Sequence, residues 1–64
     1  MNNKLKEIRL LRGMTQEELS SKSGVSRTTI GDIESGKKSV VTNLTLEKLA
    51  CALGFKVVDI FFRD

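Results

Sequence analysis

The chain has 64 residues, which is enough for one small domain but not for two, and its formal net charge is +3. It contains no histidine and one cysteine, so it lacks the usual general base, the commonest metal ligand and any disulfide within the chain. No stretch approaches the roughly 20 apolar residues of a membrane span, and the basic start has no signal-peptide core.

The positive charge is concentrated in the first part of the chain. Residues 1–38 hold the whole excess of +3, and the charges of residues 39–64 balance. Such an asymmetry is what a nucleic-acid-binding face needs. We therefore expect a single domain over residues 1–64 of a soluble, cytoplasmic DNA-binding protein. It is not expected to be an enzyme, and we expect no catalytic or metal site, no cofactor, no membrane partner and no small-molecule ligand.

The first predicted helix covers residues 3–12. Leu5 and Ile8 recur at helical spacing and can face a core, with Leu11 roughly continuing the stripe. Leu10 fits this stripe poorly, so we expect a single exposed apolar side chain or part of a contact surface.

A second helix is predicted over residues 16–23. Thr15 can accept a hydrogen bond at its start, and Glu18, three residues later, can return one to the Thr15 amide. This capping-box pattern is typical of a helix N-terminus. Gly24 suits the left-handed turn that ends the helix.

A third helix follows directly over residues 27–35. Ser26 can cap it, and Ile30 and Ile33 can face inward. Its outer face carries mostly short polar groups instead of Lys–Glu pairs: Arg27, Thr28, Thr29, Gly31 and Asp32. Two short helices joined by a tight turn are a helix-turn-helix, here over residues 15–35. The outer face is then either a contact surface or a solvated face without a partner.

The segment after the third helix is a loop over residues 37–44. Lys37 and Lys38 can hold backbone phosphates, or they can keep a solvated loop soluble. Val40 and Val41 can tuck under the domain, form a short extended piece or meet a partner chain.

A fourth helix is predicted from the segment TLEKLACALG. Thr45 is its expected cap, Leu44 and Leu49 have the spacing of a hydrophobic staple, and Gly54 ends it. Cys51 is expected as a small, partly buried filler instead of a reactive thiol. One apolar stripe at helical spacing indicates the core side: Leu46, Leu49, Ala50 and Leu53.

The tail, residues 55–64, is predicted as one or two last turns of helix. Val58 and Phe62 are expected to remain outside the core, and all three aromatic residues of the chain lie in this segment. This is more apolar surface than so small a domain can easily bury, so we expect Val58 and Phe62 to form a dimer contact. Four side chains of the tail can close the core: Phe55, Val57, Ile60 and Phe61.

The chain as a whole resembles the phage-repressor-like helix-turn-helix family, also called Xre-type or lambda-repressor-like. The segment ALGFKVVDIF resembles the family's closing segment, whereas the loop over residues 37–44 is longer than the common form. The resemblance implies an all-α, compact five-helix domain, with the third helix in the DNA major groove and the second crossing the backbone. The residues that carry it are Arg9, Gly13, Thr15, Gln16, Leu19, Gly24, Val25, Ser26, Ile30, Glu34 and Gly36.

The resemblance also implies roles for single residues. Gln16 matches a glutamine that contacts phosphate and buttresses the third helix. Arg9 and Glu34 match a structural pair that bridges the first and third helices. The base-facing positions are matched by Arg27, Thr28 and Asp32.

The chemistry of these side chains agrees with base contacts. An arginine can bind guanine O6 and N7 together, and the methyl group of Thr28 or Thr29 can pack against thymine. Asp32 can accept a hydrogen bond from cytosine N4. The helix N-termini at Gln16 and Thr45 offer free amides to phosphate.

The leading hypothesis is a sequence-specific DNA-binding transcriptional regulator, acting as a repressor and a homodimer on double-stranded DNA with two-fold symmetry. A phage or mobile-element repressor and a restriction–modification controller both remain open. The alternative is an antitoxin-like interaction module that uses the surface around Val58 and Phe62, with DNA binding secondary.

Overall fold

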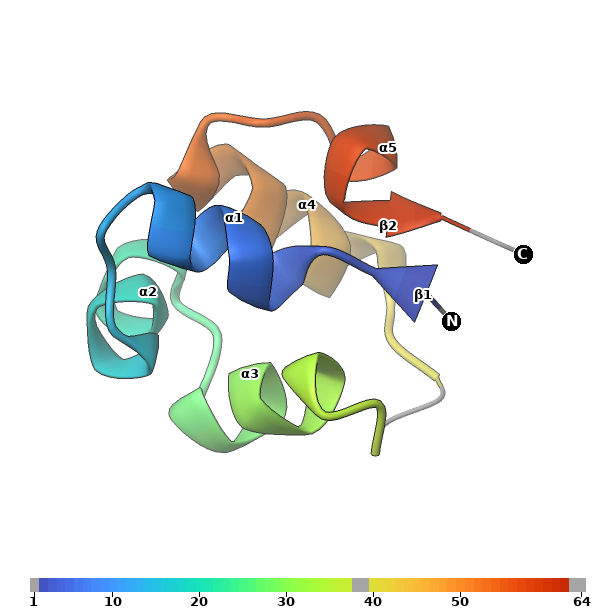
Figure 1. The fold of residues 1–64 in the computed structure, drawn as a ribbon. Coiled ribbons are helices and arrows are strands. Elements are labelled where there is room, and N and C mark those ends of the chain that lie inside the picture. The colour runs from blue at the N-terminus through green and yellow to red at the C-terminus, as the bar shows by residue number, and fades with distance from the viewer. Residues whose placement is uncertain (1, 38–39, 63–64) are drawn as a thin grey trace.

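The computed structural model describes residues 2–37 and 40–62, without the side chains of Asn2 and Phe62. Within these ranges the chain forms five helices and one short antiparallel strand pair (Figure 1). The all-α, five-helix fold expected from the sequence is confirmed, and the strand pair is an addition to it. In chain order the elements are β1 (Asn2–Asn3), α1 (Leu5–Leu11), α2 (Gln16–Ser23), α3 (Arg27–Glu34), α4 (Asn43–Leu53), α5 (Val57–Ile60) and β2 (Phe61–Phe62).

Helix α1 is shorter than predicted and directs one arginine inward. Leu5 and Ile8 are buried, but Leu11 is 75% exposed, so its predicted place in the stripe is wrong. The inward side continues with Arg9, which lies four residues after Leu5 and therefore shares its face, whereas Arg12, just past the end of α1, is exposed. Arg9 is 7% exposed.

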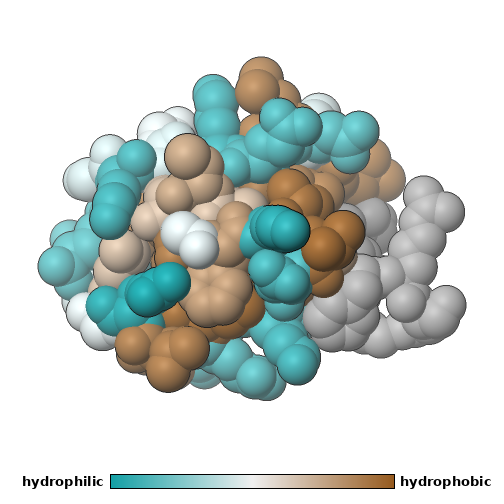
Figure 2. Space-filling view, turned by 90° about the horizontal axis from the view of Figure 1, so that it is seen from above, coloured by the Kyte–Doolittle hydropathy of each residue, from teal (hydrophilic) through white to brown (hydrophobic). Residues whose placement is uncertain are grey.

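Several large apolar side chains stay on the surface of the described part of the chain. Leu10 is among them, as expected. In the loop before α4, Val41 packs against the core, whereas Val40 is exposed. Figure 2, seen from above and so from the side away from α3, shows apolar surface interspersed with hydrophilic side chains. The exposed residues are Leu10, Leu11, Val40, Leu44 and Val58.

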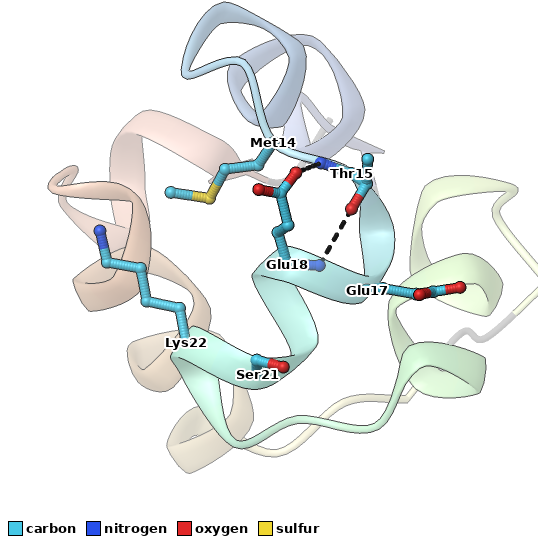
Figure 3. Close-up of a pocket in the computed structure, with 6 residues that line it drawn as sticks. All are labelled: Met14, Thr15, Glu17, Glu18, Ser21 and Lys22. Carbon is cyan, nitrogen blue, oxygen red and sulfur yellow. Dashed lines mark hydrogen bonds between the residues drawn. The ribbon is translucent and has the colours of Figure 1, made fainter.

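The α2–turn–α3 unit forms as predicted. The Thr15 hydroxyl accepts from the Glu18 amide at 3.0 Å, and the Glu18 carboxylate accepts from the Thr15 amide at 2.9 Å (Figure 3). Gly24 ends α2 with a φ of 77°, a conformation that costs other residues energy. Ser26 then caps α3 by accepting from the Thr29 amide at 3.2 Å. Helix α2 has the predicted bounds, and α3 differs only at its last residue.

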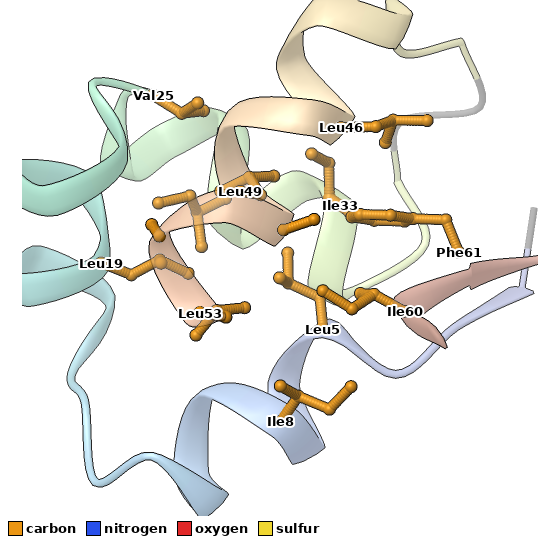
Figure 4. Close-up of a cluster of buried hydrophobic side chains, with 13 residues drawn as sticks. Leu5, Ile8, Leu19, Val25, Ile33, Leu46, Leu49, Leu53, Ile60 and Phe61 are labelled. Carbon is orange, nitrogen blue, oxygen red and sulfur yellow. The ribbon is translucent and has the colours of Figure 1, made fainter. Parts of the chain in front are cut away.

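The core is built around α4. Figure 4 shows side chains from all five helices and β2 meeting in one cluster. Because α3 gives Ile30 and Ile33 to this cluster, hydrophobic burial fixes which face of α3 points outward. The buried apolar residues are Leu5, Ile8, Leu19, Val25, Ile30, Ile33, Leu46, Leu49, Ala50, Ala52, Leu53, Ile60 and Phe61.

Helix α4 begins three residues earlier than predicted. Thr42, not Thr45, is its cap: the Thr42 hydroxyl accepts from the Thr45 amide at 3.2 Å. Leu44 is 62% exposed, so the predicted staple with Leu49 is wrong. The half-buried Val41, just before the true cap, contacts the core instead, and this contact selects the earlier start.

The tail leaves the helical conformation earlier than predicted. Helix α5 is a single turn, and the prediction of helix is wrong for Phe61 and Phe62, which are extended. They pair with the first residues of the chain in the register Asn3–Phe61, and the Lys4 amide donates to the Ile60 carbonyl at 2.7 Å. This pairing satisfies backbone groups at both ends of the chain.

Cys51 is exposed, so its predicted role as a partly buried filler is wrong. At helical spacing it lies off the stripe that α4 buries. It lines a surface hollow of about 420 Å³ with Lys22, Ser23, Leu44, Glu47, Lys48 and Ala52. In the described part of the chain, no helix is long and apolar enough to cross a membrane.

Candidate nucleic-acid interface

Helix α3 lies at one side of the molecule (Figure 1), and its exposed residues are polar. Its apolar side is held by Ile30 and Ile33, both at most 2% exposed. On the other side Arg27 and Thr28 are exposed, and Asp32 is half-buried. Among the described residues no ion pair involves Arg27, so its guanidinium can meet an external acceptor.

Thr29 differs from the other predicted base-facing residues. Its hydroxyl oxygen accepts from the Ser26 hydroxyl at 2.8 Å, within the cap of α3. It is also half-buried. The hydroxyl oxygen therefore has a structural partner within the cap, and the methyl group and the O–H donor are left for an external contact.

Two polar side chains, one from α1 and one from α2, hold the last turn of α3. The Glu34 carboxylate accepts from Arg9 Nε at 2.7 Å and from Arg9 Nη2 at 3.2 Å. The same carboxylate accepts from Gln16 Nε2 at 3.1 Å, and Arg9 Nη1 donates to the Met14 carbonyl at 2.7 Å. This network ties the start of α2 to the end of α3, which fixes the relative orientation of the two helices.

A polar hollow of about 330 Å³ opens beside the N-terminus of α2. The amides of Gln16 and Glu17 have no acceptor within the helix, because the first turn of a helix leaves its amides free. Arg27 brings positive charge to the same hollow, and Glu17 brings negative charge. The lining residues are Arg9, Thr15, Gln16, Glu17 and Arg27.

The other predicted phosphate-contacting residues differ in what the structure shows for them. Lys37 is exposed directly after α3, and its amide donates to the Asp32 carbonyl at 2.9 Å. Lys38 lies outside the described residues. Thr45 is the third residue of α4 and its amide is bonded to Thr42, so the predicted free amide there is wrong.

The predicted dimer contact is described only in part. Val58 on α5 is 72% exposed. The side chain of Phe62 lies outside the described residues. The buried neighbour Phe61 belongs to the core, so the exposed apolar surface of this segment rests on Val58.

The described residues contain no group of three or more His, Cys, Asp or Glu side chains that could hold a metal ion. A further hollow lies along α2, about 610 Å³ in volume, and two carboxylates and one lysine line it (Figure 3). It is lined by Met14, Thr15, Glu17, Glu18, Ser21 and Lys22.

Two residues beside this interface were not found from the sequence. Asn3 donates from Nδ2 to the Ile33 carbonyl of α3 at 3.2 Å. Arg12 donates to the Leu53 carbonyl at 2.8 Å and lies over the Phe55 ring, 4.7 Å from its centroid. An asparagine two residues before a helix was the available sign for Asn3. The contacts of Arg12 with α4 and Phe55 had no local sign.

The fold and the α2–turn–α3 unit define a helix-turn-helix protein. The family described as Helix-turn-helix matches residues 5–60. The chain therefore belongs to the helix-turn-helix family of transcriptional regulators, and the resemblance seen in the sequence is confirmed.

Several curated proteins are similar over the whole chain. An uncharacterized HTH-type transcriptional regulator of Methanocaldococcus jannaschii is 49% identical over 64 residues, covering 100% of this chain and 96% of that protein. One from Archaeoglobus fulgidus is 39% identical over 64 residues, covering 100% and 90%. The uncharacterized HTH-type transcriptional regulator YgzD of Bacillus subtilis is 40% identical over 65 residues, covering 100% and 96%. No solved structure matches the chain.

Proposed function

We propose that this protein is a sequence-specific DNA-binding repressor that inserts α3, its reading helix, into the major groove. The observation that carries this proposal is the outward face of α3. Arg27 and Thr28 are exposed there, while Ile30 and Ile33 hold the helix on the core. A major groove admits one α-helix, and base edges in it can be told apart by hydrogen bonds and methyl contacts.

Different side chains of α3 contact different bases. Arg27 at the first turn donates two hydrogen bonds to guanine O6 and N7, which is the commonest specific contact. Thr28 packs its methyl group on thymine, and Asp32 accepts from cytosine N4 one turn later. Thr29 contributes its methyl group, while its hydroxyl accepts from Ser26.

Phosphate contacts flank this reading face. The free amides at the start of α2 bind one phosphate, with Gln16 beside them, because a helix N-terminus attracts anions. Lys37 and Lys38 hold a second phosphate after α3, and Lys37 is exposed for this role. At the start of α4, the amides of Asn43 and Leu44 replace the predicted contact of Thr45.

The protein acts as a homodimer on a two-fold symmetric operator. One domain offers only a few base contacts, so two half-sites about 34 Å apart multiply affinity and specificity. The domain extends 27 Å along its longest axis, so two adjacent copies can span such a site. The exposed Val58 on α5 supports a contact there, with Phe62 beside it in sequence.

The test is selection of bound duplexes from a randomised pool, with the wild-type protein at physiological salt. The proposal expects an enriched inverted repeat with half-site centres about one helical turn apart. Arg27→Ala should lose preference at one or two positions of each half-site. The charge-matched control Lys48→Ala, on the outer face of α4, should keep the wild-type motif. An unenriched pool with weak, salt-sensitive binding would contradict the proposal and favour an antitoxin-like interaction module.

A further inference from the structure

One side chain, that of Asn3, connects three elements of the fold. Its Oδ1 accepts from the Leu5 amide at 3.1 Å, at the start of α1. Its Nδ2 donates to the Ile33 carbonyl at 3.2 Å, in the last turn of α3. Its backbone lies in β1 opposite Phe61 of β2. The terminal strand pair is therefore bonded directly to the helix that carries the proposed base contacts.

Asn3 bonds to two backbone groups at helix ends, the Leu5 amide and the Ile33 carbonyl. The Leu5 amide is in the first turn of α1, where no intrahelical acceptor is available, whereas the Ile33 carbonyl in the last turn of α3 has two lone pairs and accepts the Asn3 bond as a second one. The Ile33 carbonyl also accepts from the Gly36 amide at 3.2 Å. An asparagine amide supplies one acceptor and two donors from a single planar group. Serine and aspartate can replace the acceptor but not the donor that reaches Ile33.

The last turn of α3 is thus held from two sides. On one side Glu34 is bonded to Arg9 and Gln16. On the other side the neighbouring residue, Ile33, is bonded to Asn3. Loss of either support frees the end of α3 while its apolar side stays packed.

We propose that Asn3 is a positioning residue that sets the end of α3 and makes DNA selectivity depend on the terminal strand pair. This inference rests on the proposed function. The proposed contact between copies, at Val58 and Phe62, lies on α5 and β2, and β2 pairs with the strand that contains Asn3. The strand pair therefore carries part of the proposed contact between copies and also supports the end of α3 through Asn3.

The test compares Asn3→Ser and Asn3→Asp with the wild type. Both variants keep an acceptor for the start of α1, so both should fold, and they differ in charge. Ala52→Gly is the control: it weakens a buried position of α4 and leaves the sequences of α3 and the strands unchanged. For each protein, the affinity for the selected operator is divided by the affinity for a scrambled duplex.

We expect both Asn3 variants to lose about threefold to tenfold in this ratio, the effect of one net hydrogen bond. Ala52→Gly should keep the wild-type ratio. The dimer dissociation constant of Asn3→Ser, measured by sedimentation without DNA, should equal that of the wild type. Two Asn3 variants with the wild-type ratio would overturn the inference while leaving the proposed function intact.

Amide exchange gives a second readout that needs no DNA. In Asn3→Ser, the amides at the end of α3, residues 33–36, should exchange several-fold faster than in the wild type, with those of α2 unchanged. Equal exchange would overturn the positioning role. If the wild-type protein itself does not distinguish the two duplexes, the proposed function fails, and exchange alone decides whether Asn3 positions α3.

Discussion

Arg9 and Glu34 form an ion pair of 2.7 Å that joins α1 to the last residue of α3, with side chains only 8% and 5% exposed. Neither charge is well solvated, so each depends on the other. Gln16 donates to the same carboxylate, so the pair also fixes the start of α2. One buried contact thereby sets the geometry of the whole helix-turn-helix unit.

Removal of Arg9 should strongly destabilise the fold. Arg9→Met leaves the Glu34 carboxylate buried without its cation, which costs about 3–5 kcal/mol in the free energy of unfolding. The double variant Arg9→Met with Glu34→Leu should lose less, because it removes both charges. Urea denaturation, followed by circular dichroism, measures the free energy of unfolding of both variants. A double variant less stable than Arg9→Met would contradict this account.

Two glycines of the unit should respond to alanine with opposite signs. Gly24 has a φ of 77°, and its added Cβ would meet nothing within 4 Å, so Gly24→Ala should cost about 1 kcal/mol from backbone strain alone. Gly31 is helical, and its Cβ would lie 3.8 Å from Gln16 Nε2, an ordinary contact. Gly31→Ala should therefore stabilise by about 0.5–1 kcal/mol. Thermal unfolding measures the change in stability of each variant relative to the wild type. If both variants are stabilised, or both are destabilised, the explanation is wrong.

Arg27→Ala should relax specificity instead of weakening all binding. The loss expected is about 1–3 kcal/mol on the operator, confined to one or two base positions. Titration of operator duplexes with single base changes measures it. If the loss is equal on every sequence, Arg27 contacts phosphate and not a base.

Lys37→Ala with Lys38→Ala should weaken binding uniformly across sequences. Each phosphate contact that is lost should reduce the slope of log affinity against log salt by about 0.9. Binding measured at several salt concentrations, with Lys48→Ala as the control, gives the slope. An unchanged slope would remove both lysines from the interface.

Val58→Ser should shift the protein toward monomers. Val58 is 72% exposed, so the change should leave the fold of a single copy intact. Val40→Ser is the matched control, since Val40 is 80% exposed in the loop before α4. Sedimentation equilibrium distinguishes the two, and Phe62→Ser should behave like Val58→Ser. Equal association of Val58→Ser and Val40→Ser would exclude α5 as the dimer contact.

Local patterns were enough to predict the helix-turn-helix unit. Thr15, Glu18, Gly24 and Ser26 act within a few residues of themselves, through caps and a left-handed turn. Such signals need no knowledge of distant contacts. For this reason the bounds of α2 were correct, and those of α3 were correct to one residue.

The wrong helix boundaries and the wrong core stripe involve choices that distant residues make. Thr42 and Thr45 are both good caps, and the packing of Val41 on the core selects the first. Leu11 has the right hydrophobicity for a core stripe, but Arg9 faces inward because Glu34 lies opposite.

By itself, the sequence determined the number of helices, the helix-turn-helix unit and the polar face of α3, because these follow from spacing, caps and turn residues. The tertiary structure alone decided that Phe61 is extended and that Asn3 holds α3. Both depend on the two ends of the chain lying side by side. The partners of a backbone strand or a side-chain amide are set by where the core brings distant segments together, and no local pattern encodes that.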